Sequence, residues 1–357
     1  MNNSSRLLAR SAPGVPGGRT ATRCRTTLAL SLQFLILLSG LILQGCAMHS
    51  QGESAYSAEP LHPAGTALEA ESYSSFDDCH FPFRKWLPLN GSKPSKIVVA
   101  LHGMSGASQD FTVLGEYLQR SRKDVAVYAP ELRGQGSDPE ASRRGDIQSR
   151  QEWFHDLHAF TSLVRQQHPQ ARIIWCGESM GALIALHSLA TSPDGQLTCD
   201  ALILSSPIVG THEQIPAWRI HLLRLASRLL PRMKISMETL SGKNEVRVTR
   251  DSIHQEQAAK NTYHLPAFTL RLLNTLGTMI ESSPQYAQRV TQPVLILHGG
   301  HDLFSQTSAV ESLARKFLQS QGVTLHSYPE SYHLLFYDHE RERVLSHINQ
   351  WIESLGP

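Results

Sequence analysis

Short apolar runs alternate with helix-like stretches along most of the chain. The runs are apolar at successive positions, whereas a strand with one face in water is apolar at every second position. Strands that are apolar throughout are buried on both faces, which is typical of a parallel sheet covered by helices. The pattern therefore predicts an α/β fold class with a mostly parallel, doubly wound sheet. The predicted strands are 96–103, 125–130, 172–177, 201–207, 293–300 and 323–329, and the predicted helices are 111–120, 146–167, one from residue 180, 308–318 and 341–355.

One interval lacks this alternation. Between Pro207 and Pro293 no run has the pattern of a strand, and the segments "IPAWRIHLLRLASRLL" and "LPAFTLRLLNTLGTMI" have helical spacing. We therefore expect a helical cap over 211–290, inserted into an α/β core formed by 76–210 and 291–357. Reactive groups in parallel sheets gather at the carboxyl ends of the strands, so the cap is expected to cover that edge.

The N-terminus differs in composition from the rest. Residues 1–27 contain five arginines and no acidic residue, and the apolar run "LALSLQFLILLSGLILQGC" follows them. A basic flank, an apolar core and small residues near its end are typical of an export signal, which we assign to residues 1–45. Residues 46–75 are mostly small, polar and aperiodic, and they are expected to form a flexible tether.

The end of this signal resembles the lipobox of bacterial lipoproteins. In "LQGC" the resemblance implies that Cys46 is diacylated and becomes the new N-terminus. Ala47 follows instead of aspartate, which in that family implies passage to the outer membrane, here facing the periplasm. An uncleaved membrane anchor and simple secretion remain alternatives, because about 18 mostly apolar residues nearly suffice to span a bilayer. All three place the folded body in the cell envelope or outside the cell.

Removal of residues 1–45 changes the charge. The formal net charge is +2 for the whole chain, but five basic and no acidic residues leave with the signal, so 28 basic and 31 acidic residues give −3. The remaining chain has no basic excess, which argues against a nucleic acid partner. Cys176 lies in an apolar run and is expected in the core. Cys79 and Cys199 form a disulfide only if the fold brings them together.

The stretch "IIWCGESMGALIALHSLA" has the pattern of a strand that turns directly into a helix. Such a turn leaves no room for side chains on either side of its tip. Gly177 and Gly181 relieve that crowding and leave Ser179 exposed at the tip, as in a nucleophile elbow. An ordinary serine in a tight turn is the alternative, so the hypothesis needs a base and an acid elsewhere.

The base and the acid are expected at two other strand ends. His333 follows the last predicted strand, and Asp302 ends "PVLILHGGHD". The order Ser179, Asp302, His333 is the chain order of α/β-hydrolases. Other candidates are expected to be structural histidines, namely His102, His298, His301 and His326, or solvated loop acids, namely Glu330 and Asp338.

Acyl transfer also needs backbone N–H groups that face the developing oxyanion. Met180 follows the nucleophile at a helix start and supplies one such group. The second is expected from Met104, in the loop after "VVALHG", where Gly103 shapes the turn.

The chain resembles the monoacylglycerol lipase and lysophospholipase group of α/β-hydrolases, which is related to serine aminopeptidases, over about residues 80–355. The matching stretches are "LHGMSG", "YAPELRGQGSD", "GESMG", "SSPIV", "PVLILHGGHD" and "YPESYHLLFYDHERERVLSHINQWI". The resemblance implies that Ser179 is the nucleophile, Asp302 the acid and His333 the base. Arg133 and Asp138 match a loop that stabilises the site in this group. The stretch "ELRGQG" departs from the usual Asp-x-Arg-Gly-His-Gly.

The first predicted cap helix is basic and amphipathic. Trp218, Leu222, Leu225 and Leu229 share one face, and the surrounding basic residues are Arg219, Arg224, Arg228, Arg232 and Lys234. Such a helix suits a lid on anionic lipid, which would feed acyl chains inward. The alternative is a cap helix with one packed and one solvated face.

The sequence thus predicts a serine hydrolase that cleaves carboxylic esters of single-chain lipids, such as monoacylglycerols or lysophospholipids, through an acyl-enzyme. The mechanism needs no metal or organic cofactor. A thioesterase or acyltransferase with the same triad, an aminopeptidase of related fold and a non-catalytic binding lipoprotein remain alternatives. Head group, acyl-chain preference and oligomeric state are left open.

Overall fold

The computed structural model describes residues 67–192, 199–210, 217–236, 248–249 and 263–356. The predicted export signal, Cys46 and most of the predicted tether lie outside these residues. Within them, no helix is long and apolar enough to cross a membrane.

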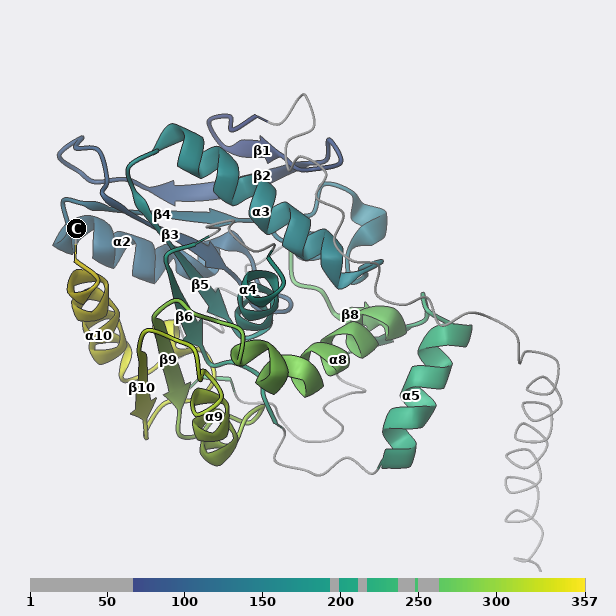
Figure 1. Cartoon of the computed structure of the whole chain (residues 1–357). Coiled ribbons are helices and arrows are strands. Elements are labelled where there is room, and N and C mark those ends of the chain that lie inside the picture. Colours follow the sequence, from purple (N-terminus) through teal and green to yellow (C-terminus); the bar gives the residue numbers. More distant parts are fainter. Residues whose placement is uncertain (1–66, 193–198, 211–216, 237–247, 250–262, 357) are drawn as a thin grey trace, which may run out of the picture. The chain divides into compact units, whose positions relative to one another are not determined.

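An eight-stranded sheet forms the centre of the described structure (Figure 1). All neighbouring strands run parallel except at one edge, where the second strand of the chain pairs antiparallel with both of its neighbours. The six predicted strands are confirmed, and all of them are almost entirely buried except the last, which forms a partly exposed edge. The order across the sheet is β1 (Ser72–Ser74), β2 (His80–Trp86), β4 (Val125–Pro130), β3 (Lys96–Leu101), β5 (Arg172–Glu178), β6 (Ala201–Ser205), β9 (Val294–Gly299) and β10 (Val323–Tyr328).

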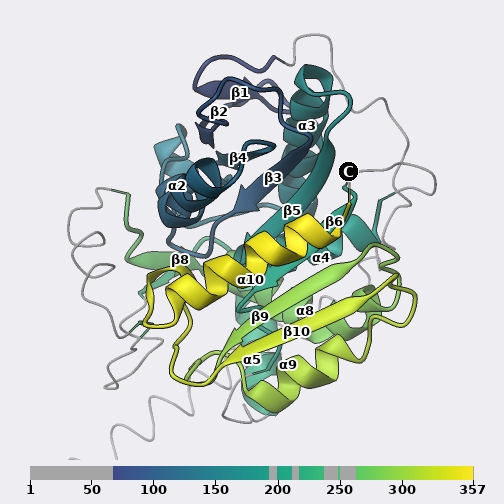
Figure 2. The same ribbon diagram turned by 90° about the vertical axis from the view of Figure 1, so that its left-hand side faces the viewer.

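Helices cover both faces of the sheet, as expected for a doubly wound fold. Figure 2 shows α10 (Arg341–Ser354) lying across the face that α2 (Thr112–Ser121) also covers. The opposite face is covered by α3 (Arg150–Gln167), α4 (Met180–Ala190), α8 (Leu270–Ala287) and α9 (Thr307–Ala314). The predicted helices are therefore confirmed, with ends that differ by a few residues.

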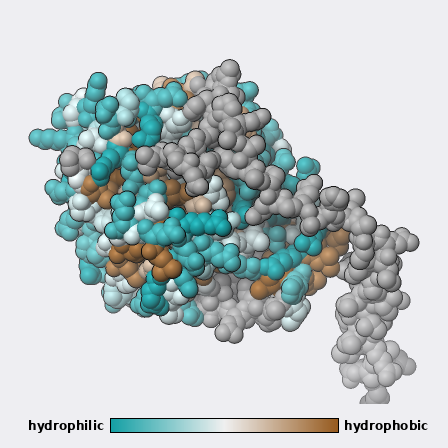
Figure 3. Space-filling model, viewed as in Figure 1, coloured by the Kyte–Doolittle hydropathy of each residue, from teal (hydrophilic) through white to brown (hydrophobic). Residues whose placement is uncertain are grey.

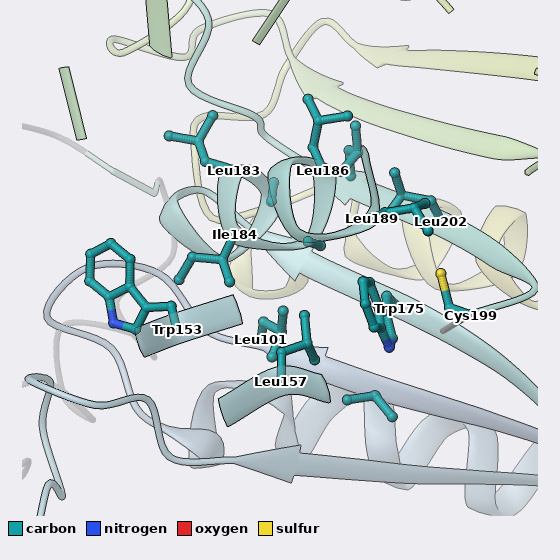
Figure 4. Close-up of a cluster of buried hydrophobic side chains, with 14 of the residues drawn as sticks. Leu101, Trp153, Leu157, Trp175, Leu183, Ile184, Leu186, Leu189, Cys199 and Leu202 are labelled. Carbon is teal, nitrogen blue, oxygen red and sulfur yellow. The ribbon is translucent and has the colours of Figure 1, made fainter. Parts of the chain in front are cut away.

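Helix α4 is the most deeply buried helix of the described chain. All its residues from Met180 to Leu189 are buried, because it lies between the sheet, α3 and α8. Figure 4 shows Ile184 of α4 on the side of Trp153 from α3 and Leu189 beside Leu202 from the sheet. Each such large apolar side chain contributes roughly 1.5–3 kcal/mol when it leaves water. The position of α4 is therefore set by packing on several sides.

The cap differs from its prediction. Helix α5 (Ala217–Leu229) and α8 are present, but β7 (Lys234–Ser236) and β8 (Ala267–Thr269) pair antiparallel between them. The expectation of an interval without strands is wrong, because three-residue strands are too short to give a periodic pattern. The apolar face of α5 is not packed against the rest of the described structure, because Trp218, Leu222 and Leu229 are 63%, 53% and 60% exposed.

The chain joins the fold earlier than predicted. Residues 67–75 were assigned to the tether, yet Tyr73 is buried in β1 and Ser75 donates a 2.5 Å hydrogen bond to Asp156 of α3. The alternating burial of β2 shows why these strands were missed: they form a half-exposed edge without a continuous apolar run.

Arg133 connects this N-terminal edge to the core. Its buried guanidinium makes two hydrogen bonds to Asp77 and two to Asp156, all of 2.8 Å. It also lies over the rings of Phe76 and Phe81. Paired hydrogen bonds to carboxylates on two sides fix the planar guanidinium in one orientation. The structural role expected of Arg133 is therefore confirmed.

The described cysteines are free thiols. Cys176 is buried in β5, as predicted, and Cys199 is buried next to β6. Cys79 instead lies near the surface, where its sulfur accepts a hydrogen bond from Arg143 at 3.3 Å. The open possibility of a Cys79–Cys199 disulfide is thus not realised in the structure.

We predict that Arg133→Leu lowers the free energy of unfolding by about 3–5 kcal/mol, because Asp156 would remain buried without a countercharge. Urea unfolding monitored by tryptophan fluorescence measures this change. The matched control is Arg120→Leu, which removes an exposed ion pair with Glu116 in α2 and should cost less than about 0.5 kcal/mol. Equal losses in the two variants would contradict the role of Arg133.

Candidate active site

Ser179 sits at the tip of a sharp turn between β5 and α4. Its φ of +55° lies in the left-handed region, which is strained for a residue with a side chain. A Cβ atom at Gly177 would overlap the backbone of Gly181, and one at Gly181 would overlap the carbonyl oxygen of Leu101. The turn therefore requires glycine on both sides of Ser179, as its sequence pattern predicts.

The end of β6 connects the Ser179 turn to the loop of His333. The N–H of Ser179 donates to the carbonyl of Ser205 at 2.9 Å. The hydroxyl of Ser206 donates to the carbonyl of His333 at 2.6 Å. Ser206 itself has a φ of +45°. Two consecutive serines thus bring the turn and the histidine loop to the same edge of the sheet.

His333 and Asp302 are in direct contact. Nδ1 of His333 lies 2.8 Å from Oδ2 of Asp302, and both side chains are buried. The other carboxylate oxygen accepts a 2.8 Å hydrogen bond from the N–H of Phe304, whose ring packs edge-on against the imidazole. With its proton on Nδ1 directed at the carboxylate, the imidazole leaves Nε2 free to act as a base.

The two acids nearest to His333 in the sequence have different surroundings. Glu330 is exposed, as expected. The expectation that Asp338 is a solvated charge is wrong, because its carboxylate is buried and accepts hydrogen bonds from the N–H groups of Tyr332 at 2.6 Å and His339 at 2.9 Å. Asp338 shapes the loop that carries His333, which is a local role that no sequence pattern revealed.

The other candidate histidines have structural surroundings. The ring of His102 lies with Nδ1 2.9 Å from the Gly103 carbonyl and Nε2 3.1 Å from the Leu132 N–H, which ties two loops together. His298 is buried with Nδ1 3.9 Å from Asp302, a longer distance than that of His333. His326 stacks on His347 at 4.1 Å, and the exposed His301 lies beside Tyr332.

The predicted oxyanion donors lie next to the nucleophile. Gly103 approaches so closely that a Cβ there would be 3.2 Å from Cβ and 3.7 Å from Oγ of Ser179. Met104 is the next residue, and Met180 begins α4 directly after Ser179. In the described structure the N–H groups of Met104 and Met180 have no hydrogen-bond partner. Backbone N–H groups without a partner are the kind of donor that an oxyanion needs.

Glu178 was not singled out from the sequence. It lies between Gly177 and Ser179, is buried, and its Oε1 has no hydrogen-bond partner among the described residues. Burial raises the pKa of this carboxyl well above its usual value, and the charge of Asp110 raises it further. Both effects disfavour the charged form of this carboxyl beside Ser179. An acid directly after a fully apolar strand was the available signal.

Two buried imidazoles join α4 to its neighbouring helices. Nε2 of His158 in α3 lies 2.7 Å from the Ser188 hydroxyl, and Nε2 of His187 lies 3.1 Å from that of Ser283 in α8. Burial lowers the pKa of His158 to about 4 and that of His187 to about 3. Both rings are therefore neutral at physiological pH.

Comparison with known proteins identifies the family of this chain. The family model described as "Serine aminopeptidase, S33" matches residues 92–340, more than half of the chain. The chain belongs to this family. It is 26% identical over 287 residues to a monoacylglycerol lipase of Mycolicibacterium smegmatis, covering 79% of this chain and 96% of that protein.

Solved structures share the fold. The crystal structure of a Paleococcus ferrophilus monoacylglycerol lipase superposes with a TM-score of 0.65 at 21% identity, over 77% of this chain and 99% of that one. A soluble variant of the Saccharomyces cerevisiae monoglyceride lipase gives 0.67 at 19% identity, over 83% and 98%. The S33 chain therefore has the α/β-hydrolase fold, and its family and relatives make it an ester-hydrolysing enzyme.

We predict that Gly181→Ala destabilises the fold by at least about 3 kcal/mol, because neither the Leu101 carbonyl nor the buried α4 can move aside. Gly277→Ala is the matched control, since a Cβ there meets no atom within 4 Å. That control lies inside α8 and should stabilise the fold by about 0.5–1 kcal/mol. Thermal unfolding of both variants measures the difference, and a tolerated Gly181→Ala would contradict the assigned turn.

We also predict that stability falls as the pH decreases below about 6.5. His158 and His187 bind protons in the unfolded chain near pH 6.5 but in the fold only near pH 4 and 3. The unfolded state therefore binds more protons in this window, which costs roughly 2 kcal/mol per imidazole between pH 7.5 and 5. Urea unfolding at each pH measures the slope. His187→Leu should flatten it, whereas the exposed His339→Gln should not.

Proposed function

We propose that this enzyme is a serine hydrolase that cleaves carboxylic esters of single-chain lipids through an acyl-enzyme. The observation that carries the proposal is the buried 2.8 Å contact between His333 and Asp302, at the sheet edge where the Ser179 turn also ends. In this proposal Ser179 is the nucleophile, His333 the base and Asp302 the acid that orients the imidazole.

Acylation begins when Nε2 of His333 takes the proton of the Ser179 hydroxyl as its oxygen attacks the acyl carbonyl. The buried Asp302 carboxylate stabilises the imidazolium that forms. The N–H groups of Met104 and Met180 donate to the oxyanion of the tetrahedral intermediate, and each such donor contributes about 3 kcal/mol to lowering the barrier. The imidazolium then returns the proton to the leaving alcohol.

Deacylation repeats these steps with water as the nucleophile. His333 removes a proton from the water as it attacks the Ser179 ester, and the same N–H groups hold the second oxyanion. The raised pKa of Glu178 fits this cycle, because it disfavours a charged carboxylate, which would repel the developing negative charge. No step requires a metal or an organic cofactor.

The surface of α5 supports a lipid substrate. Trp218, Leu222 and Leu229 of this helix are exposed, as are Arg228 and, just after the helix, Arg232. Figure 3 shows hydrophobic and hydrophilic surface side by side in the region of α5. Apolar side chains flanked by cations suit the boundary of an anionic lipid surface. The names of the relatives, monoacylglycerol and monoglyceride lipase, favour single-chain glycerides as the substrate class.

We further propose that lipidated Cys46 or an N-terminal anchor tethers the enzyme to a membrane of the bacterial cell envelope, with the outer membrane facing the periplasm as the expected site. The basic flank and apolar run of residues 1–45 and the sequence "LQGC" support this location. Metabolic labelling with a palmitate analogue tests this location. If Cys46 is lipidated, the unaltered chain incorporates the analogue and the Cys46→Ala variant does not.

We predict that the full chain in mild detergent hydrolyses p-nitrophenyl esters and monoacylglycerol, and that Ser179→Ala lowers kcat by at least about a thousandfold. The measurement compares chain lengths from C2 to C16, with lysophosphatidylcholine as a second lipid. Ser320→Ala is the matched control, since its hydroxyl bonds to the backbone of Gln292 and Gly322 far from Ser179 in the sequence, and it should keep full activity.

Two outcomes would change the assignment. Failure of a fluorophosphonate probe to label Ser179 in the unaltered chain would exclude the serine hydrolase mechanism. Labelling without hydrolysis of any of these esters would favour the thioesterase or acyltransferase alternative, which thioester substrates and acyl acceptors then test.

A further inference from the structure

The loop that carries Met104 contacts the cap through one side chain. We call residues His102–Ala107 the oxyanion loop. Within it Ser105 has a φ of +65°, and the N–H of Gly106 donates to the carbonyl of Gly103 at 3.1 Å. A positive φ at the third residue of such a turn favours glycine, so a serine is held there against its conformational preference.

The hydroxyl of Ser105 explains why serine occupies this position. It donates to the carbonyl of Leu265 at 3.0 Å and accepts from the N–H of Leu265 at 3.1 Å. Nδ1 of His264 lies 3.3 Å away. Leu265 precedes β8 and α8, so a single side chain of the oxyanion loop satisfies both backbone groups of one cap residue.

The opposite side of the turn is held by the core. The N–H of Ser105 donates to Oε1 of Gln135 at 3.0 Å, and the Gln135 side chain is buried. Gln135 belongs to "ELRGQG", at the position where related enzymes usually have histidine. Gly136 lies so close to Gly106 and Tyr263 that a Cβ would contact both. The oxyanion loop is therefore held on one side by the stretch "ELRGQG" of the core and on the other side by the cap.

We propose that Ser105 is a positioning residue that couples the place of the cap to the geometry of the oxyanion hole. The inference rests on the proposed function, because it assumes that the Met104 N–H binds the oxyanion. Ser105 follows Met104 directly in the chain. If the hydrogen bonds to Leu265 are lost, the turn relaxes, and the peptide groups next to the Met104 N–H rotate. Small displacements of an oxyanion donor reduce the rate without weakening substrate binding.

The test compares Ser105→Ala and Ser105→Gly in the full chain, with Ser320→Ala as the control that loses equivalent hydroxyl-to-backbone bonds elsewhere. Alanine removes the hydroxyl and keeps the Cβ, while glycine also removes the conformational strain. We expect both Ser105 variants to lower kcat for p-nitrophenyl butyrate by about tenfold, with KM changed less than twofold. The control should keep both values.

A second readout separates positioning from stability. Phosphonylation of Ser179 by a fluorophosphonate and inhibition by an alkyl boronic acid both need the oxyanion hole but not the natural substrate. We expect the phosphonylation rate constant and the boronic acid affinity to fall by the same factor as kcat. Hydrogen exchange should rise together in the oxyanion loop and in the cap residues 263–267.

Three results would overturn the coupling. The first is that kcat and the phosphonylation rate constant are unchanged in both Ser105 variants. The second is that Ser105→Ala lowers kcat but Ser105→Gly keeps the original value. The third is that the Ser105 variants lose no more activity than Ser320→Ala and that the loss follows thermal stability alone. If the unaltered chain fails to react with the fluorophosphonate, the proposed function fails and the coupling fails with it. A reactive chain with unaltered Ser105 variants rejects the coupling only.

Discussion

The close approach of three backbone segments at the end of β5 determines the rest of the structure. Gly177, Gly181 and the carbonyl of Leu101 lie so near one another that no Cβ fits between them. This contact fixes where β5 ends, where α4 begins and how β3 lies beside them. The strained Ser179 is stable only because α4 is buried on several sides and cannot shift. The packing of one helix thus holds Ser179, which is itself buried, at the tip of the turn.

Three buried carboxyl groups near this turn have different surroundings. Asp302, buried against His333, is the carboxylate that contacts a proposed catalytic group. Burial raises the pKa of the neighbouring Glu178, and the buried Asp338 accepts hydrogen bonds from two backbone N–H groups. Burial thus disfavours a negative charge beside Ser179, whereas the Asp302 side chain lies against the imidazole of His333.

Much of this arrangement was predictable, for identifiable physical reasons. Strands β3 to β6 and β9 are buried on both faces, so their sequences are apolar at nearly every position, whereas the edge strand β10 is partly exposed. The turn at Ser179 was predictable because steric crowding demands glycines at a fixed spacing. The order of Ser179, Asp302 and His333 then located three strand ends, and the structure brings two of these side chains into contact.

What escaped prediction depends on contacts between distant residues. Strands β1, β7 and β8 have three residues each, too few for any periodicity. The burial of Asp338 follows from the fold of one loop, and the Ser105 contact joins residues 160 positions apart. Such pairs leave no pattern in a single sequence, because each partner alone resembles an ordinary loop residue.

The place where the chain enters the fold has a mechanical consequence. Residue 67 leads into β1, at the edge of the sheet opposite to β9 and β10, which precede Asp302 and His333. A pulling force on the preceding chain would act first on β1 and β2, and then on the hydrogen bonds of Arg133 to Asp77 and Asp156. These contacts lie between residue 67, where the force would enter, and the strands that precede Asp302 and His333. Such a force would therefore act first at the edge of the sheet that lies furthest from β9 and β10.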